Sequence, residues 1–244
     1  MSRTHALILA AGVGQRMRSG GMPKQFIKLM GKPIVVYTLE KFQSCEEVDD
    51  IFIVCHNGYI ELMQELVDLY KLNKVKQIII GGEARQSSLQ IGLNAIEDGG
   101  AADDDLIVIH DGVRPLVTEN TIRENIRIAG SEGSAVTVHP VTESVVITDA
   151  HDAGMEDFKK RADTYSLTSP QTFRLGEIRD AFERVQKETP EIPLLDAAMV
   201  YAQAGGRVQL VKEQNNNFKI TTPEDYYYLK AMLELEENRT VFGL

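Results

Sequence analysis

Apolar residues follow two different periods along this chain. Mostly apolar runs of strand length occupy residues 6–10, 51–54, 75–80 and 106–110. Between these runs, apolar residues recur every three or four positions, as expected of helices that bury one face, at 34–42, at 59–72 and after Ser88. Strands that alternate with helices in this way predict a parallel, doubly wound α/β sheet. The carboxyl ends of such strands are where ligands bind.

The second half of the chain continues the alternation less regularly. We expect helices at 120–128, 175–187 and 194–204, strands at 135–138 and 208–211, and a final helix that Thr222 caps and Pro223 opens. From 139 to about 163 the rhythm breaks, because the β-branched residues 145–148 predict an exposed strand and the polar residues that follow, 149–160, predict a surface loop. No repeat or low-complexity linker occurs, which predicts one domain over residues 1–244 with 139–163 as an appendage.

Composition limits the classes of function that fit. The 244 residues are 43% hydrophobic and 25% charged, ordinary values for a globular protein with a sizeable core. With 26 basic and 36 acidic side chains the formal net charge is −10, which argues against a broad surface for nucleic acid. No apolar run approaches the length that spans a membrane and no signal-peptide core is present, so we expect a cytoplasmic protein that binds no membrane. Cys45 and Cys55 lack metal-binding spacing and are expected to be buried thiols.

A glycine-rich loop directly follows the first strand. It contains Gly12 and Gly14, and it also carries Arg16 and Lys24. Glycines at this place allow the backbone to approach a ligand closely, and the neighbouring N–H groups form a concavity that suits anions. Because cations lie in the same loop, the expected anion is a polyphosphate. Two familiar nucleotide motifs do not match, since Met17 stands where a dinucleotide fingerprint needs a glycine or alanine, and the chain has no Gly-Lys-Ser/Thr.

Two further strands end in candidate ligand-binding residues. The strand at 75–80 is followed by Gly81 and Gly82, which we expect to face the same crevice as the first loop. The strand at 106–110 is followed by Asp111, whose carboxylate is well placed to hold Mg²⁺. The alternative is that Asp111 caps the next turn and forms a salt bridge with Arg114.

Four separated motifs carry a family resemblance. They are Leu-Ala-Ala-Gly-x-Gly-x-Arg-Met with Pro-Lys-Gln at 9–25, Gly-Gly-x-x-Arg-x-x-Ser at 81–88, His-Asp-x-x-Arg-Pro at 110–115, and Ser-Pro-Gln-x-Phe at 169–173 with Ser169 in place of the family's threonine. In this order they resemble the sugar- and polyol-phosphate nucleotidyltransferases, and within them the cytidylyltransferases that make CDP-methylerythritol or CDP-ribitol. The resemblance spans essentially the whole chain. It implies a Rossmann-like nucleotidyltransferase sheet with a protruding β-arm at 139–163.

The resemblance also implies a reaction. A polyol phosphate attacks the α-phosphorus of CTP in line and pyrophosphate leaves, with Mg²⁺ bridging triphosphate oxygens near Asp111. A phosphate monoester is already largely ionised near neutral pH, so no general base is needed and we expect His110 to be a structural residue. Catalysis then consists of positioning and of neutralising the charge of the phosphates.

Site residues are carried over from the family position by position. The resemblance implies that Arg16, Lys24 and Lys219 act on the phosphates. It implies that the nucleotide is bound by Ala10, Ala11, Gly12, Gly14, Gly81, Gly82, Glu83, Arg85 and Ser88. It assigns the acceptor to Asp111, Arg114, Ser144 and Arg161, of which the last two would be delivered by the arm into the neighbouring subunit of a homodimer. From the residues alone, Ser87 or Ser88 would cap a helix, and Lys219, on a short strand, would be a solvated surface charge.

Two acceptors are compatible with the motifs. Methylerythritol-phosphate enzymes usually carry Asp-Thr where this chain has Glu143-Ser144, and residues 160–162 and 217–222 look more like the ribitol-phosphate members. Residues 85–93, in contrast, look like the methylerythritol branch. We expect 2-C-methyl-D-erythritol 4-phosphate, of the isoprenoid precursor pathway, because that pathway is widespread. Ribitol 5-phosphate, for CDP-ribitol and cell-surface polymers, is the alternative.

Two other classes of function stay open on the sequence. The first is a CTP-binding protein that has lost catalysis, which the joint presence of Arg16, Lys24, Asp111 and Lys219 disfavours. The second is uridylyl or other nucleotidyl transfer to a hexose phosphate, which residues 81–88 disfavour.

Overall fold

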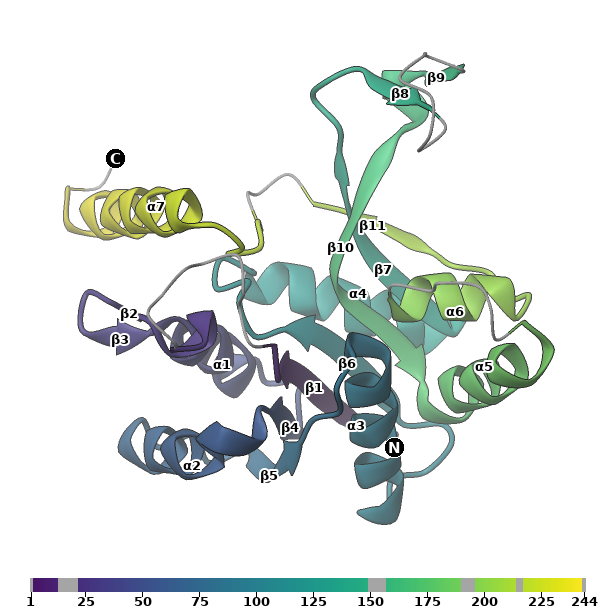
Figure 1. Ribbon diagram of the computed structural model, residues 1–244, viewed down its shortest axis with the longest axis horizontal. Coiled ribbons are helices and arrows are strands. Elements are labelled where there is room, and N and C mark those ends of the chain that lie inside the picture. Colours follow the sequence, from purple (N-terminus) through teal and green to yellow (C-terminus); the bar gives the residue numbers. More distant parts are fainter. Residues whose placement is uncertain (1, 13–21, 149–156, 190–195, 214–216, 243–244) are drawn as a thin grey trace.

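The computed structural model of the chain describes residues 2–12, 22–148, 157–189, 196–213 and 217–242. Its central sheet has seven strands in the order β11-β7-β10-β6-β1-β4-β5 (Figure 1). Their bounds are Thr4–Ala10 for β1, Asp50–Cys55 for β4, Val75–Ile80 for β5, Leu106–Asp111 for β6, Ser134–Pro140 for β7, Tyr165–Arg174 for β10 and Leu210–Lys212 for β11. Within this sheet, β10 runs antiparallel to its two neighbours, and the other pairs of neighbouring strands are parallel. The predicted mostly parallel α/β sheet is confirmed.

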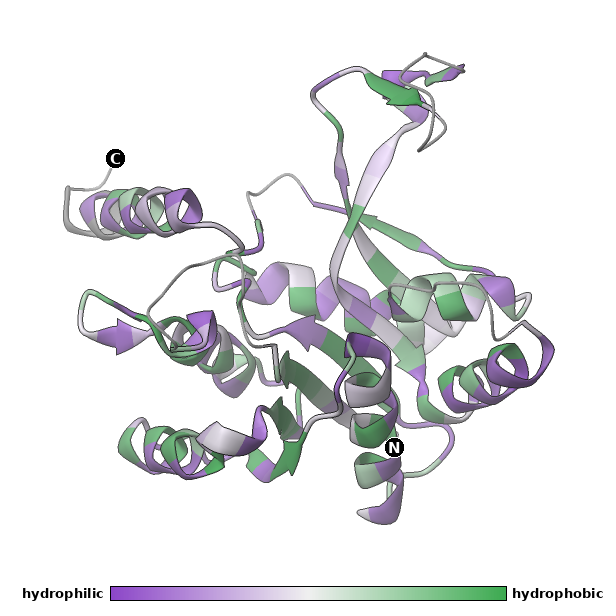
Figure 2. Ribbon diagram, viewed as in Figure 1, coloured by the Kyte–Doolittle hydropathy of each residue, from purple (hydrophilic) through white to green (hydrophobic). Residues whose placement is uncertain are grey.

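Helices cover both faces of this sheet (Figure 1). On one face lie α1 (Ile34–Ser44), α2 (Ile60–Leu69) and α4 (Glu119–Glu132), and on the other lie α3 (Arg85–Asp98), α5 (Leu175–Glu188) and α6 (Ala197–Gln203). The alternation of side chains along β1 explains the two layers, because Ala6 and Ile8 pack with α1 and α2 whereas Leu7 packs with α3 and α5. The middle residues of β1, β4 and β6 are therefore apolar, and Figure 2 colours β1 green.

A third, smaller core lies beside the carboxyl edge of the sheet. It joins α7 (Pro223–Phe242), through Leu229, to Leu29 and Ile34. Leu29 belongs to a short hairpin of β2 (Lys28–Leu29) and β3 (Lys32–Pro33), whose turn places Gly31 at a φ of 83°. The connection before α7 also joins this core through Ile220. This packing brings the C-terminal part of the chain next to the end of β6.

Among the seven strands of the central sheet, β10 is the one that the hydrophobic pattern did not predict. Residues 166–170 are mostly polar and include a proline, so they give no strand signal. Tertiary pairing forms the strand, since Gln171–Arg174 pair with β6 on one side, and residues 165–167 and 171–173 pair with β7 on the other. The expected short strand around Lys219 is wrong, because residues 217–220 form an irregular connection that is tied to the turn after β6 by Ile220 N–H and Val113 O.

The first turns of α3 and α7 hold cap hydrogen bonds, and Ser87 takes part in one of them as predicted. α3 begins at Arg85, so both serines lie inside its first turn rather than before it. Ser87 Oγ accepts the N–H of Ala84 at 3.0 Å, and the buried Ser88 donates to Gly82 O at 3.3 Å. At α7 the helix starts at Pro223 as predicted, and the cap hydrogen bonds described there are accepted by Asp225 from the N–H groups of residues 221 and 222, at 2.7 and 2.8 Å.

The appendage at 139–163 is a β-arm. Beyond the sheet, β7 and β10 lead into a hairpin of β8 (Val145–Ile147) and β9 (Asp157–Lys159), which Figure 1 shows projecting from the body. The predicted exposed strand at 145–148 is confirmed. The expected loop is wrong at 157–159, which pair with β8, and residues 149–156 lie outside the described part of the chain.

The cysteines match their prediction. Cys45 and Cys55 are buried and unpaired with one another, and burial raises the pKa of each thiol to about 11. Both are therefore unreactive thiols near neutral pH. Among the helices in the described residues, none combines the length and apolar character needed to cross a membrane.

Candidate active site

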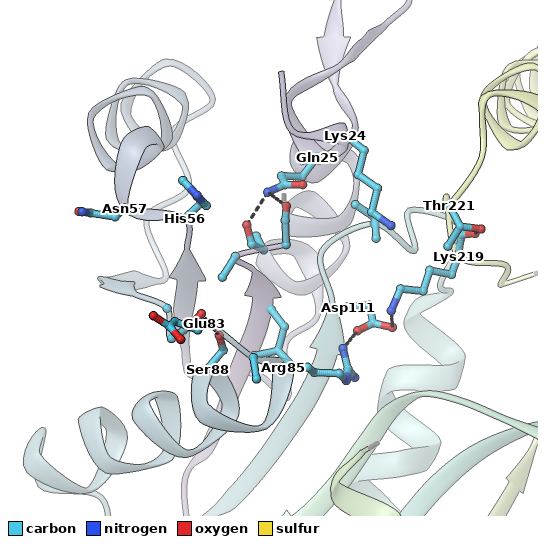
Figure 3. A pocket seen from close by; sticks show the side chains of 18 residues that line it. Lys24, Gln25, His56, Asn57, Glu83, Arg85, Ser88, Asp111, Lys219 and Thr221 are labelled. Atoms are coloured by element: carbon cyan, nitrogen blue, oxygen red, sulfur yellow. Dashed lines mark hydrogen bonds and ion pairs between the residues drawn. The ribbon is translucent and has the colours of Figure 1, made fainter. Parts of the chain in front are cut away.

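A cavity of about 750 Å³ opens at the carboxyl ends of β1, β4, β5 and β6 (Figure 3). Eleven of the residues singled out from the sequence line it: Ala10, Ala11, Gly12, Lys24, Gly81, Gly82, Glu83, Arg85, Ser88, Asp111 and Lys219. They come from segments far apart in the chain, and the strand order brings these segments together. The expectation that the glycines after β1 and β5 face one crevice is confirmed.

Five of the predicted site residues are not in this lining. Arg114 lies just behind the cavity wall and contacts Asp111. Ser144 and Arg161 are on the arm, where Arg161 Nη1 donates to Thr142 O at 3.5 Å, and they do not line the cavity of their own chain. Gly14, together with Arg16, lies outside the described residues, so their predicted roles rest on the sequence alone.

The chemical centre of the cavity is Asp111, at the end of β6. Its carboxylate pairs with Arg85, with Arg114 Nε at 3.1 Å and with Lys219 Nζ at 3.1 Å. Three positive side chains against one carboxylate leave a formal net charge of +2 in a chain whose overall charge is −10. Burial would raise the pKa of Asp111, but the charges of the three cations hold it well below its usual range. This cluster is therefore built to attract an anion.

Lys24 approaches the same centre from the other side (Figure 3). Its Nζ donates to Ile220 O at 2.7 Å, a contact between residues 196 positions apart that joins the glycine-rich loop region to the connection carrying Lys219. Burial lowers the pKa of Lys219, and the neighbouring Asp111 opposes this shift. The surface position that the residues alone suggested for Lys219 is wrong, because its ammonium group faces the cavity.

The residues around Asp111 do not form a metal cage. In the part of the chain that the structure describes, no three His, Cys, Asp or Glu side chains gather closely enough to hold an ion. The salt bridge to Arg114, the alternative considered for Asp111, is present. Asp111 alone fits a divalent ion that arrives on a triphosphate, because Mg²⁺ in such sites keeps water and phosphate ligands and needs only one or two carboxylates.

Gln25 is a site residue that the sequence pattern did not reveal. It is buried, and its Nε2 donates to Ala10 O at 2.6 Å and to Gly12 O at 3.0 Å. It thus fixes the end of β1 where the backbone faces the cavity. Its place in the Pro-Lys-Gln motif was the available signal, but its partners became visible only in the fold.

Three other polar residues of the lining were also missed: His56, Asn57 and Thr221. His56 and Asn57 follow β4, so the rule that ligands gather at strand ends could have found them. The Nδ1 of His56 accepts the N–H of Gly58 at 3.1 Å, which leaves Nε2 as the protonated nitrogen of the neutral ring.

Gly81→Ala is expected to weaken CTP binding about tenfold. A Cβ at Gly81 would overlap Ala11 Cβ and would lie 3.0 Å from Ser88 Oγ and 3.1 Å from Val54 Cγ1. Overpacking of this kind costs about 1–3 kcal/mol, and it would be relieved by moving Ala11 on the cavity edge. Equilibrium titration with CTP measures the effect. The matched control is Gly130→Ala in α4, whose new Cβ would lie 3.9 Å from its nearest neighbour; unchanged affinity in Gly81→Ala would contradict the assignment.

The fold and the cavity together are those of an α/β protein that binds its ligand at the carboxyl edge of a mostly parallel sheet. Residues 4–235 match the family model IspD, described as 2-C-methyl-D-erythritol 4-phosphate cytidylyltransferase. The chain belongs to this family of CTP-dependent nucleotidyltransferases, whose members generally use a divalent cation.

Relatives with similar sequence identity to this chain are named for two different activities. A ribitol-5-phosphate cytidylyltransferase of Streptococcus agalactiae is 36% identical over 242 residues, which are 98% of each chain. A 2-C-methyl-D-erythritol 4-phosphate cytidylyltransferase of Clostridium botulinum is 35% identical over 234 residues, 96% of this chain and 99% of its own. A solved structure described as 4-diphosphocytidyl-2C-methyl-D-erythritol synthase, from Anaerococcus prevotii, has the same fold, with a TM-score of 0.81 over 96% of both chains at 23% identity.

Proposed function

We propose that this cytidylyltransferase transfers CMP from CTP to a polyol phosphate and releases pyrophosphate. The observation that carries the proposal is the cluster of Arg85, Arg114 and Lys219 around the single carboxylate of Asp111, opposite the glycine edges of one cavity. Its net positive charge suits a site where two phosphate-bearing substrates meet. The family to which the chain belongs supports the same reaction.

The cavity has two ends that fit the two parts of CTP. Ser88 lies at one end (Figure 3), and Gly81 and Gly82 precede it in the same lining, with a Cβ built on Gly81 only 3.0 Å from Ser88 Oγ. Backbone groups and a hydroxyl at this end can recognise the edge of a pyrimidine. Lys24 and Lys219 lie toward the other end and can neutralise the phosphates. We assign Arg16 to the same task on the family motif. The acceptor phosphate would enter beside Asp111 and Arg114, on the side from which it can attack the α-phosphorus.

The reaction needs positioning and charge rather than a general base. An acceptor phosphate is already ionised near neutral pH. His110, beside Asp111 in sequence, is fully buried, and burial lowers its pKa to about 3, so it is a neutral ring that carries no catalytic proton. A divalent ion bound with the triphosphate would add charge neutralisation, with Asp111 as its protein ligand.

Ribitol 5-phosphate is the first candidate for the acceptor. Ser144 and residues 160–162 depart from the methylerythritol pattern, and the relative from Streptococcus agalactiae is named for ribitol 5-phosphate. 2-C-methyl-D-erythritol 4-phosphate, which we expected from the sequence, is the second candidate, favoured by residues 85–93 and by the relative from Clostridium botulinum.

Nucleotide selectivity separates this function from the other classes. Wild-type protein with Mg²⁺ is expected to release pyrophosphate with CTP and acceptor and to give little with UTP. Equal rates with UTP would favour uridylyl transfer. Binding of CTP without any pyrophosphate release from either polyol phosphate would favour a protein that binds the nucleotide and has lost catalysis.

The proposal includes a homodimer in which the arm of each subunit completes the pocket of the other. Ser144 and Arg161 lie on the arm and do not line the cavity of their own chain, which supports a role in a second subunit. The hairpin also exposes Val146 and Phe158, at 54% and 67% of their full accessible surface. Figure 2 shows the apolar strand β8 at the tip of this arm, and exposed apolar groups of this kind mark interaction sites.

Mixing two inactive variants tests this arrangement. Arg161→Ala, with a defective arm, and Lys219→Met, with a defective pocket, are each expected to have little activity as homodimers. A heterodimer joins the intact pocket of the first chain to the intact arm of the second, so mixing them with subunit exchange is expected to restore part of the wild-type rate. No recovery, or a wild-type protein that sediments as a monomer, would withdraw Ser144 and Arg161 from the site.

A further inference from the structure

A buried chain of hydrogen bonds lies behind the charged cluster. His110 Nε2 contacts Arg114 O at 3.2 Å, His110 Nδ1 contacts Ser169 Oγ at 3.0 Å, and Asp111 N–H donates to that same Oγ at 3.2 Å. His110 is fully buried and Ser169 is 2% exposed. None of these contacts touches the cavity directly, yet they begin and end on Arg114 and Asp111, two members of the charged cluster.

The direction of each hydrogen bond follows from the chemistry of the groups. Arg114 O is a carbonyl and can only accept, so Nε2 is the protonated nitrogen of His110. In the neutral ring Nδ1 is then an acceptor, and it takes the hydroxyl proton of Ser169. The oxygen of Ser169 is left to accept the N–H of Asp111. Each member thus has its partner, and the chain fixes one tautomer of the histidine.

The hydroxyl of Ser169 takes the place of a backbone carbonyl as the acceptor for Asp111 N–H. The pairing of β10 with β6 ends at Gln171 and Ile109, and continuing this register would place Ser169 opposite Asp111. The backbone oxygen of Ser169 is used elsewhere, by Asn217 Nδ2 at 2.7 Å, so the serine hydroxyl supplies the acceptor that Asp111 N–H needs.

The same network reaches the connection that carries Lys219. Arg114 Nη1 donates to Asn217 O at 2.8 Å, and Ile220 N–H donates to Val113 O at 2.9 Å. The turn 111–114 is itself closed by Arg114 N–H to Asp111 O at 3.1 Å. A shift of the turn would therefore move Asp111, Arg114 and Lys219 together relative to the glycine edge of the cavity.

We propose that His110, acting through Ser169, is a positioning residue that holds the Asp111–Arg114 turn where the acceptor phosphate and Lys219 must meet. The inference rests on the proposed cytidylyl transfer for its kinetic consequence and on the hydrogen-bond chain alone for its structural one. Neither residue touches the nucleotide end of the cavity, so their loss should lower turnover with little effect on CTP affinity.

Three variants and one control test the kinetic consequence. His110→Phe keeps an aromatic ring against Phe42, whose ring centre lies 5.1 Å away, and removes both nitrogens. Ser169→Ala removes only the hydroxyl, and Ser169→Thr keeps it. Because a displacement of about 1 Å costs on the order of 100-fold in rate, we expect kcat to fall by up to about 100-fold in the first two variants and to stay close to wild type in Ser169→Thr. Leu72→Ala, a buried change in the turn between α2 and β5, is the control for lost stability alone.

The following outcomes distinguish a positioning role of His110 and Ser169 from a merely structural one. A kcat of Ser169→Ala equal to that of Leu72→Ala, or an equal loss in Ser169→Thr and Ser169→Ala, would overturn the proposal. If His110→Phe does not fold, the comparison of Ser169→Ala with Ser169→Thr decides by itself. A loss of CTP affinity as large as the loss of kcat would also overturn it, since the network would then shape the whole cavity.

A spectroscopic readout does not depend on turnover. Nitrogen NMR of histidine-labelled protein is expected to show His110 with a protonated Nε2 and an unprotonated Nδ1, and Ser169→Ala is expected to move the Nδ1 resonance. An unmoved resonance, or the opposite tautomer, would overturn the hydrogen-bond chain. If the wild-type protein turns over neither polyol phosphate, the proposed function fails while these spectra still decide the inference.

Discussion

Lys219→Met is expected to lower kcat by about 100- to 1,000-fold while leaving the protein folded. The ammonium group lies 3.1 Å from Asp111 Oδ2 and faces the centre of the cavity, so methionine removes a charge that would neutralise phosphate oxygens. The backbone around it keeps its own anchors, because Ile220 O still accepts from Lys24 at 2.7 Å and Ile220 N–H still donates to Val113 O. Steady-state rates of pyrophosphate release, together with a melting curve, measure both expectations.

The control for this variant is Lys230→Met. Lys230 lies on α7 and pairs with Glu234 at 3.6 Å on the surface, so the substitution makes the same change of net charge far from the cavity. Its rate is expected to match the wild type. Turnover near normal in Lys219→Met would remove Lys219 from the catalytic residues.

Asp111→Asn is expected to abolish most turnover and also to destabilise the protein by about 2 kcal/mol. Its carboxylate is 6% exposed and balances three cations, which would be left without a counter-charge. Breaking a fully buried ion pair from one side costs about 3–5 kcal/mol, and the smaller value applies because Arg85 and Lys219 remain about one-third exposed and can turn toward water.

Asp111→Asn is also expected to keep its ability to bind anions. Without Asp111 the cluster keeps its three positive charges, so inorganic pyrophosphate without added metal should stabilise Asp111→Asn against heat at least as much as it stabilises the wild type. Asp98→Asn, an exposed change at the end of α3, is the matched control. A variant that is inactive and also gains no stability from pyrophosphate would contradict the view of Asp111 as the counter-ion of a phosphate site.

Local signals were sufficient to predict most of the sheet and one side of the cavity. An apolar run such as Ala6–Ala10 specifies a buried strand, and a glycine or aspartate directly after such a run must lie at the strand's carboxyl end. This is why Gly12, Gly81 and Asp111 could be placed without coordinates. The parallel strands β1, β4, β5 and β6 then bring those ends to one edge.

The parts that could not be predicted depend on contacts between distant segments. β10 carries no apolar run and becomes a strand because it fills the space between β6 and β7. Gln25 and Ser169 are ordinary polar residues in sequence, and their roles come from partners that the fold brings near, such as Ala10 O and the N–H of Asp111. The meeting of Arg85 and Lys219 on one carboxylate likewise required the strand order and the packing of α7.

The most direct test of the account is pyrophosphate release from CTP and Mg²⁺, run in parallel on ribitol 5-phosphate and 2-C-methyl-D-erythritol 4-phosphate. The account predicts rapid release with a polyol phosphate, a clear preference for one of the two and a larger kcat/KM for ribitol 5-phosphate. A preference for the methylerythritol substrate would keep the reaction and reverse the order of the two acceptors. Release with neither substrate, from a folded protein that binds CTP, would contradict the central claim.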